Sequence, residues 1–415
     1  MNATPHLALA RSTPQPATRP VLAGTELHDD AALAQRLAVL SRSFEARAAD
    51  LDRSGGFPFE NLADLQAERL IGAAVPVSAG GGGATLAVAR RIVGAVGRAE
   101  PATALVLTMG YLVQRSLARA DSRWPASLRN TVWRSAVEEG ALANSLRVEP
   151  ALGSPARGGL PGTVARRVAD GWRLTGHKLY TTGIPALRWL LVYARSEEPE
   201  GTRVGVFLVP REAPGIRVIE SWDHLGLRAS GSHEVVFDDV PLPLSHAVDL
   251  RVPQEWTGGP DPDQYAWMSV LLGALYDGVA RAARHWLLGF LNSRAPGSLG
   301  APLATLPRVQ HTVGEIEVLL ASNEALLDRL VANTDAGRVP TVNESSIVKH
   351  LVSKQAIQAV ELALQLSGNH GLSRRNPLER HHRDVLCSRI HTPQDDSVLG
   401  AAGQAALRAH APASA

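Results

Sequence analysis

GHKLYTTG at residues 176–183 and LGLRASGS at residues 225–232 are the two stretches that decide the fold. Both lie between about Val164 and Val248, where short runs of β-branched and aromatic residues are separated by Gly, Pro and Asp. This pattern predicts an antiparallel sheet unit. The predicted strands are Gly171–Thr175, Trp189–Arg195, Val204–Val209, Ile216–Glu220 and Glu234–Phe237.

Helical segments flank this sheet unit on both sides. Apolar residues recur at helical spacing from Asp29 to about Leu146, and the same period returns from about Asp263. The run Gly80–Gly83 is interpreted as a turn, because no strand leads into it as a phosphate-binding loop would require. The predicted later helices are Ala274–Asn292, His311–Thr334 and Glu344–Ser367, the last with Asn343 at its start and Gly368 just past its end. The order of helices, sheet and helices excludes a simple alternating βαβ fold.

Length and composition indicate a globular chain of several domains. The 415 residues are 45% hydrophobic and 20% charged, and the formal net charge is only +2. We therefore expect neither nucleic acid nor a membrane as a partner. The lone Cys387 favours a cytoplasmic location, because it cannot form an internal disulfide. The predicted boundaries are a disordered tail at 1–28, a helical domain at 29–146, a β domain at 147–250, a helical bundle at 251–405 and a second tail at 406–415.

Six motifs occur in a consistent order along the chain. They are Leu51–Glu60 with Val75-Pro76, VEPALGS at 148–154, GHKLYTTG at 176–183, LGLRASGS at 225–232, Gln365–Gly368, and PLER at 377–380 with Arg383-Asp384. Over about residues 30–405 the chain resembles the acyl-CoA dehydrogenase superfamily, and in particular its flavin-dependent monooxygenase branch. The resemblance implies an α+β multidomain fold with an N-terminal helical domain, a middle β-barrel-like domain and a C-terminal four-helix bundle. It also implies a homotetramer.

The resemblance further implies a flavin site beside the central motif. Tyr180 would pack on the isoalloxazine ring, Thr182 would hydrogen-bond near N5, and Ser154 would contact the phosphates or the ring rim. Flat walls and donors suit this ring, because the protein's task is to orient and tune it. Ordinary strand packing is the alternative role for Tyr180 and Thr182.

A second group of cofactor contacts is expected near the end of the chain. Arg294 corresponds to an arginine that reaches the cofactor pyrophosphate of a neighbouring subunit, where a guanidinium offers a planar fork of donors. Gln310 would follow as a nucleotide contact, and Gln365 and Gly368 would complete the group. The alternative for Arg294 and Gln310 is a solvated surface pair. FAD is the expected cofactor, and because Asn369 replaces the family's second glycine, reduced FMN is the alternative.

The pattern departs from that of a dehydrogenase at the catalytic base. Thr392 stands where the family's glutamate would remove the α-proton, and threonine does not ionise at usable pH. An earlier helical position that carries the base in other members corresponds to Tyr265–Ser269, which has no carboxylate and also lacks the arginine that holds acyl-CoA. Both losses argue against an ordinary acyl-CoA dehydrogenase.

His391 is the predicted catalytic residue. Several flavin-dependent monooxygenases of this fold carry a histidine at this place, and an imidazole could hydrogen-bond oxygenated flavin or an ionised substrate. The alternative is that His391 only crosses the end of a bundle helix. His370, His381, His382 and His391 lack the spacing of a metal helix, so no metal is expected.

Three functions remain open from the sequence. The first is a monooxygenase or oxidase that uses reduced flavin and oxygen on a small organic substrate, with a separate flavin reductase as a partner. The second is an acyl-CoA dehydrogenase whose base is displaced to Asp261, Asp263 or Asp396. The third is a catalytically silent flavoprotein or scaffold, since fold alone does not decide activity.

Overall fold

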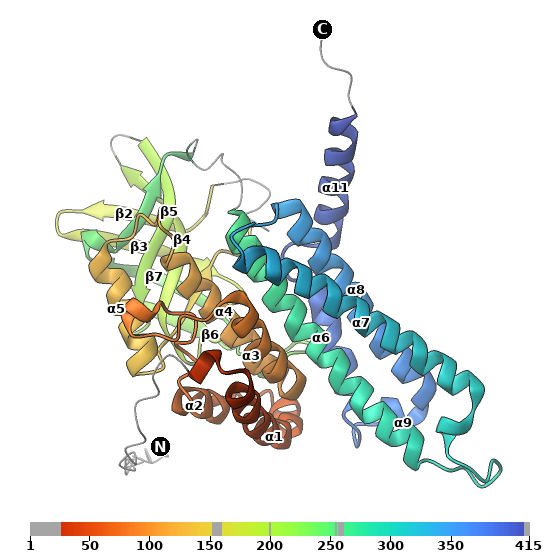
Figure 1. The fold of residues 1–415 in the computed structure, drawn as a ribbon. Helices are drawn as coiled ribbons and strands as arrows, with labels where there is room; N and C mark the ends of the chain where they lie inside the picture. The colour runs from red at the N-terminus through yellow and green to blue at the C-terminus, as the bar shows by residue number, and fades with distance from the viewer. Residues whose placement is uncertain (1–25, 152–159, 199–200, 254, 256–260, 411–415) are drawn as a thin grey trace, which may run out of the picture.

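A computed structural model of the chain describes residues 26–151, 160–198, 201–253, 255 and 261–410. N-terminal helices lie against a sheet on one side and a bundle of longer helices on the other (Figure 1). This arrangement confirms the predicted α+β class and the order of its three parts. The N-terminal helices are α1 (Asp30–Ser54), α2 (Phe59–Ala67), α3 (Leu86–Ala99), α4 (Pro101–Leu117) and α5 (Ala126–Glu138).

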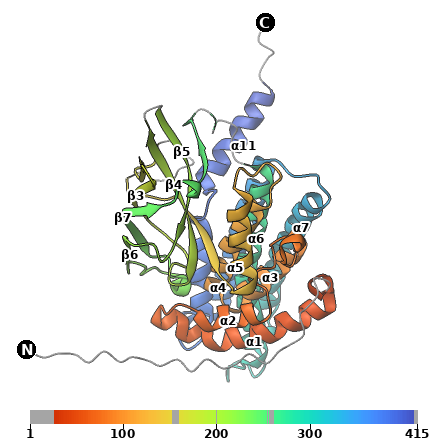
Figure 2. The same cartoon turned by 90° about the vertical axis from the view of Figure 1, so that its left-hand side faces the viewer.

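The sheet stands beside the helices, with α4 and α5 next to it (Figure 2). Its strands are β1 (Leu142–Leu146), β2 (Val164–Val168), β3 (Gly171–Lys178), β4 (Leu187–Glu198), β5 (Gly201–Pro210), β6 (Ile216–Ile219), β7 (Glu234–Leu242) and β8 (Ala247–Arg251). Their order is β6-β7-β3-β2-β4-β5-β8, and β1 pairs with β4 in parallel. All five predicted strands are present, and β3, β4, β5 and β7 extend beyond the predicted ends.

Strand β1 is a correction to the sequence-based picture, because it lies within the segment predicted to be helical. Its register places Asn144 beside Leu190 and Leu146 beside Val192 of β4. A five-residue apolar run cannot be told from a helix continuation by periodicity alone, which explains why it was missed. The sheet therefore begins before the motif that starts at Val148.

The C-terminal bundle is built from long helices. These are α6 (Pro262–Ser293), α7 (Pro307–Asp335), α8 (Val342–Ser367) and α10 (Leu378–Leu386), with the short α9 (Asn369–Leu372) and the projecting α11 (Asp395–Ala409) (Figure 1). Helix α8 starts earlier than predicted, because Thr341 rather than Asn343 is its N-cap and forms a capping box with Glu344. Its predicted stop at Gly368 is confirmed, with φ 55° at that glycine.

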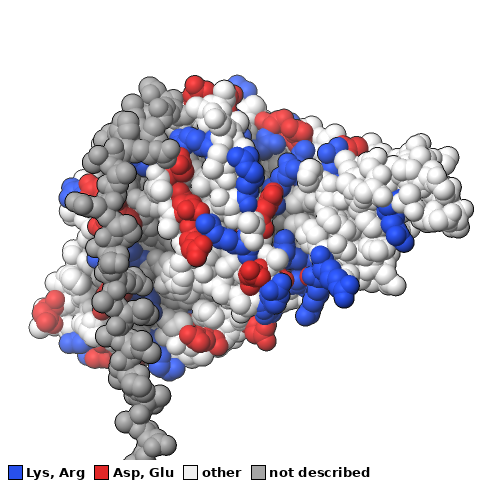
Figure 3. All heavy atoms as spheres, turned by 90° about the horizontal axis from the view of Figure 1, so that it is seen from below, with Lys and Arg blue, Asp and Glu red and all other residues white. Residues whose placement is uncertain are grey.

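Figure 3 shows charged groups of both signs over much of this face, with several basic side chains gathered near the base of the bundle tip, which is itself almost uncharged. Surface arginines are commonly paired with carboxylates, as in Arg36–Glu68 at 2.8 Å and Arg284–Glu317 at 2.6 Å. This face therefore carries no single-sign field. Across the part of the chain that the structure describes, no helix combines the length and apolar composition needed to cross a bilayer.

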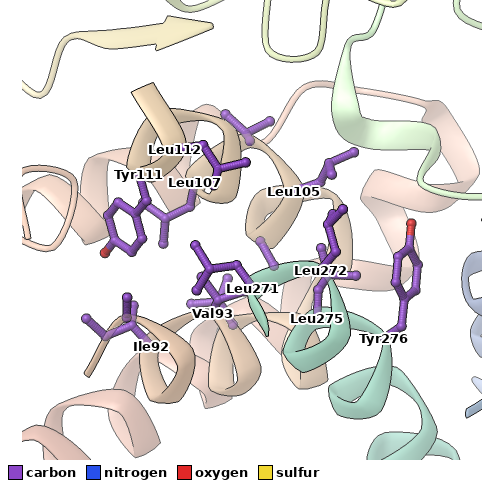
Figure 4. Close-up of a cluster of buried hydrophobic side chains, with 14 of the residues drawn as sticks. Ile92, Val93, Leu105, Leu107, Tyr111, Leu112, Leu271, Leu272, Leu275 and Tyr276 are labelled. Carbon is purple, nitrogen blue, oxygen red and sulfur yellow. The ribbon is translucent and has the colours of Figure 1, made fainter. Parts of the chain in front are cut away.

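Helices α3 and α6 join the N-terminal domain to the bundle through glycines. A Cβ on Gly278 would lie 2.7 Å from the Gly94 carbonyl oxygen, and a Cβ on Gly97 would lie 2.8 Å from the Leu275 carbonyl oxygen. Leucines and other apolar side chains from α3, α4 and α6 fill the space beside this crossing (Figure 4). The two helical domains consequently share one core.

Gly278→Ala should destabilise the protein by about 1–3 kcal/mol, because an added methyl would overlap the α3 backbone. Gly289→Ala in the same helix is the matched control, since its Cβ would have no heavy atom within 4 Å. That variant should be neutral or more stable by up to about 1 kcal/mol, because alanine favours helix. Denaturant unfolding at one fixed protein concentration measures both effects, and equal free energies of unfolding in the two variants would contradict the close crossing.

Candidate active site

The turn after β3 presents an aromatic ring beside a buried hydroxyl. Tyr180 has a left-handed backbone with φ 56°, and 55% of the residue is exposed to solvent. Hydrogen bonds fix the backbone on both sides of this turn: Thr181 N–H donates to the His233 carbonyl at 3.0 Å, and the Thr182 carbonyl accepts from Asn144 Nδ2 at 3.0 Å. A left-handed tyrosine is costly and persists only where its surroundings hold it. The ring is therefore displayed by a rigid support.

Three hydroxyls form a row behind this turn. Thr182 Oγ1 lies 2.9 Å from Ser232 Oγ, which lies 2.8 Å from Ser230 Oγ. Each of the three hydroxyls has one proton to donate. The two contacts between them use two of these protons, so one hydroxyl keeps a proton that it can donate elsewhere. Because Ser230 is fully buried, the favoured direction runs from Ser230 through Ser232 and leaves the free proton at Thr182. An exposed ring with an adjacent donor fits an isoalloxazine edge, which needs a flat wall and a donor near N5.

A buried ion pair anchors the strand that leads to Tyr180. Lys178 Nζ, fully buried, lies 2.6 Å from Glu149 Oε1. Glu149 also accepts from the Thr163 hydroxyl at 2.6 Å and from Gly162 N–H at 2.6 Å. Burial alone would raise the pKa of Glu149, but the bonds from Lys178 and Thr163 lower it, while burial lowers the pKa of Lys178. We infer from the geometry that the pair is ionised. Ser154, in the intervening segment, lies outside the described residues.

His391 is held by two helices of the bundle. Its Nδ1 lies 2.7 Å from the hydroxyl of Tyr276 on α6, and this hydroxyl points away from the leucine cluster (Figure 4). From α8, the buried Lys349 ammonium donates to the carbonyls of Ser388 at 2.9 Å, His391 at 2.8 Å and Pro393 at 3.1 Å. Neither Tyr276 nor Lys349 was predicted from the sequence.

Burial decides the charge of this imidazole. The surrounding protein, and then the Lys349 charge, lower the pKa of His391 to about 4, although the residue keeps some exposed surface. Burial also raises the pKa of Tyr276, so its hydroxyl keeps its proton and can donate to Nδ1. At neutral pH His391 is therefore a neutral imidazole, and a hydrogen bond donated by Tyr276 to Nδ1 would place the ring proton on Nε2.

One loop links the turn at Tyr180 to the segment that carries His391. The His224 ring lies 6.1 Å from the Tyr180 ring, measured between centroids. Farther along the loop, Leu227 N–H donates to Asp384 of α10 at 2.7 Å, and a Cβ on Gly226 would lie 2.3 Å from the Arg383 carbonyl oxygen. Burial raises the pKa of Asp384 to about 7. The LGLRASGS and Arg-Asp motifs thus contact each other, so their role is to join the sheet to the bundle.

The other predicted cofactor residues lie at the far tip of the bundle. Arg294 caps the end of α6, and Gln310 in the first turns of α7 donates to the Ala304 carbonyl at 3.0 Å. Gln365 and Gly368 end α8 at the same tip, which a 5.1 Å ring contact between Phe290 and His370 holds together. By helical rise, Gly368 lies about 28 Å from Lys349 along α8. Within one chain, these four residues do not approach Thr182 or His391.

Two family models match this chain. The acyl-CoA dehydrogenase middle domain matches residues 147–240, and the acyl-CoA dehydrogenase C-terminal domain matches residues 268–395. YdbM of Bacillus subtilis (strain 168), provisionally named an acyl-CoA dehydrogenase, is 32% identical over 367 residues, which cover 88% of this chain and 94% of YdbM. The chain belongs to the acyl-CoA dehydrogenase family.

Two further proteins that are similar to this chain are not named dehydrogenases. L-evernosamine nitrososynthase of a Micromonospora species is 28% identical over 384 residues, covering 87% of this chain and 86% of the relative. The solved structure of KijD3 in complex with FMN and dTDP-3-amino-2,3,6-trideoxy-4-keto-3-methyl-D-glucose has a TM-score of 0.79 at 27% identity, over 91% of this chain and 94% of KijD3. The chain is thus similar to a protein provisionally named a dehydrogenase, to one named a nitrososynthase and to one solved with FMN.

The carboxylates considered as displaced bases are already engaged or remote. Asp263 accepts two bonds from Arg115, each at 2.8 Å, and Asp261 caps α6 and pairs with Arg119. A carboxylate held by a guanidinium fork is not free to approach a substrate. Asp396 is exposed in the first turn of α11. This acyl-CoA dehydrogenase family member therefore offers no free carboxylate among these three within its interior.

The histidines near the end of the chain do not converge. His381 is buried, and burial lowers its pKa to about 3. In the described ranges, no three His, Cys, Asp or Glu side chains are grouped so that they could hold a metal ion. Any chemical role of a histidine in this region therefore belongs to a single imidazole ring.

His391→Gln should make the protein less sensitive to acid. The folded-state pKa of about 4 lies below the ordinary 6.5, so the unfolded chain binds a proton first as the pH falls. Stability is consequently lost between about pH 6.5 and 4, and glutamine removes this term. We expect the loss of unfolding free energy over that window to shrink by about 1–3 kcal/mol, at the lower end because the ring is partly exposed. An unchanged loss in chemical denaturation would contradict the neutral His391.

Proposed function

We propose that this protein is a flavin-dependent monooxygenase or oxidase that acts on a small organic substrate with reduced flavin and oxygen. The observation that carries the proposal is the neutral His391, held by Tyr276 and Lys349, next to Thr392. A dehydrogenase of this family needs a carboxylate there or at the earlier helical position, which corresponds to Tyr265–Ser269 and has none either. A neutral imidazole with its proton on Nε2 can instead donate a hydrogen bond to a polar or anionic atom while it stays uncharged.

Tyr180 and Thr182 would hold the flavin ring, and Ser154 would contact its phosphates or rim. When bound, the flavin supplies the redox and oxygen chemistry. The protein's own groups orient the reactants: the Thr182 hydroxyl offers its proton, and His391 donates from Nε2. Similarity to a nitrososynthase and to KijD3, whose structure contains FMN, supports this branch of the family over the dehydrogenases.

Assembly and supply of the flavin belong to the same proposal. Because Arg294, Gln310, Gln365 and Gly368 lie at the bundle tip, they could complete a cofactor site only in a neighbouring subunit, and we propose a homotetramer. FAD would use these tip contacts, whereas reduced FMN would not need them. A separate reductase in the cytoplasm would supply the reduced flavin.

A second candidate is acyl-CoA dehydrogenation with a displaced base. The 32% identity to YdbM favours it. The arginine contacts of Asp261 and Asp263 count against it, because both carboxylates are already held by guanidinium groups. A catalytically silent flavoprotein would bind flavin and show neither reaction.

Thr182→Val should weaken flavin binding about fivefold, since the side chain keeps its shape but loses a hydrogen bond worth on the order of 1 kcal/mol. The matched control is Ser230→Ala, which alters the buried end of the same hydroxyl row while Thr182 still accepts from or donates to Ser232. We expect the smaller effect there. Fluorescence titration with FMN and FAD measures both, and equal affinities in wild type and Thr182→Val would remove the assigned contact.

Mixing the flavin-loaded protein with saturated acyl-CoAs under anaerobic conditions should leave the flavin absorbance unchanged. Base assistance contributes about 10²–10⁴-fold, and Thr392 cannot supply it. The reduced protein should instead react with oxygen through a transient absorbance whose lifetime shortens in His391→Ala. Rapid bleaching by an acyl-CoA would overturn the monooxygenase proposal and support dehydrogenation. Identical transients in both proteins would overturn only the role of His391.

A further inference from the structure

Arg147 occupies an unusual place directly after β1. The next residue, Val148, accepts the Leu179 N–H at 3.0 Å, so Arg147 lies one strand away from the turn that carries Tyr180. Arg147 is exposed to solvent, yet desolvation by the surrounding protein lowers the pKa of its guanidinium. The side chain therefore reaches solvent beside the turn that carries Tyr180.

Two phenols flank this guanidinium. Its carbon lies 5.3 Å from the centre of the Tyr193 ring of β4, an arrangement in which an aromatic face holds a cation in place. Tyr265 from the first turn of α6 is near enough to interact with the charge, and burial raises the pKa of both phenols. The sheet and the bundle therefore both contribute to the surroundings of Arg147.

The local charge is unbalanced. Lys178 also lies close enough to Arg147 for their charges to repel. Glu149, the carboxylate nearby, is already bonded to Lys178 and Thr163. Among the residues that the structure describes, Arg147 forms no ion pair. One positive charge beside the turn that carries Tyr180 consequently has no carboxylate partner among the described residues, and an anion can approach it from solvent.

We propose that Arg147, supported by the Tyr193 ring, binds a phosphate or carboxylate group of the substrate. This inference rests on the proposed function and names the substrate class. Tyr265 and Tyr276 belong to the same helix and are separated by about 17 Å of helical rise. A substrate whose anionic group is at Arg147 and whose reacting atom is near His391 would therefore be extended, with roughly that distance between the two.

A guanidinium suits this partner because its planar fork gives two parallel donors to a phosphate or carboxylate. The flavin's own phosphate is the other possible source of the same chemistry. Arg147 lies beside the part of the site assigned to the ring, and α6 connects it with His391, so we assign the anion to the substrate. The two sources are separated experimentally by comparing FMN with riboflavin, which lacks the phosphate.

The test uses the full-length protein loaded with riboflavin and titrated with inorganic pyrophosphate by calorimetry at constant ionic strength. Wild type should bind the probe, Arg147→Ala should bind it at least about tenfold more weakly, and Arg147→Lys should be intermediate. Arg188→Ala is the matched control, because that exposed guanidinium also lies over an aromatic ring, Trp189, at 5.9 Å. It should leave the affinity unchanged.

No binding by wild type, or equal binding by wild type and Arg147→Ala, would overturn the proposal. A loss of FMN affinity in Arg147→Ala with riboflavin affinity unchanged would also overturn it, because the anion would then be the flavin phosphate. If wild type bound no flavin, the proposed function would fail. The same pyrophosphate titration of the flavin-free protein would still decide whether Arg147 binds anions.

Discussion

Helices α3 and α6 approach so closely that a methyl group at Gly97 or Gly278 would overlap the opposing backbone. This contact fixes more than the junction of two domains. Tyr276 lies between Leu275, whose carbonyl opposes Gly97, and Gly278, so the crossing also fixes where the tyrosine hydroxyl points. Since that hydroxyl bonds His391, the position of the proposed catalytic imidazole depends on backbone packing in a different domain.

The loop that includes Gly226 and Leu227 is one of the connections between the sheet and this helical unit. Asp384 accepts from that loop, while Arg383 pairs with Asp52 of α1 at 2.6 Å. All three parts of the chain therefore meet at the Arg-Asp motif. Leu227 has a left-handed backbone at this junction, where the surrounding contacts can support local strain.

The fold could be predicted from the sequence because most of its signals are local. Helical and alternating periods gave the order of the elements, and the six motifs gave the family. Local reasoning failed where a short segment depended on a distant partner, as β1 depends on β4. It also chose Asn343 as a cap, although Thr341 satisfies both halves of the capping box with Glu344.

The site was less predictable for the same physical reason. Tyr276 contacts His391 across 115 residues, and nothing in the apolar stripe of α6 marks that tyrosine as different from a core residue. Lys349 offered a weak signal, because a lysine lies among buried positions of α8. Arg147 directly precedes a recognised motif but matches no part of it. Predicted residues such as Thr182 and Arg294 came from resemblance, and their roles stay predictions.

Lys349 also determines how the ordered segment around His391 is held in place. One positive centre draws three carbonyl oxygens inward, which is the arrangement that many proteins obtain from a bound calcium or sodium ion. Here the cation is attached covalently to the chain. The order of the segment around His391 thus does not depend on a supply of metal ions and cannot be removed by a chelator. The lysine amine is, however, open to reactions that a metal ion does not undergo, such as acylation in an unfolded or nascent chain.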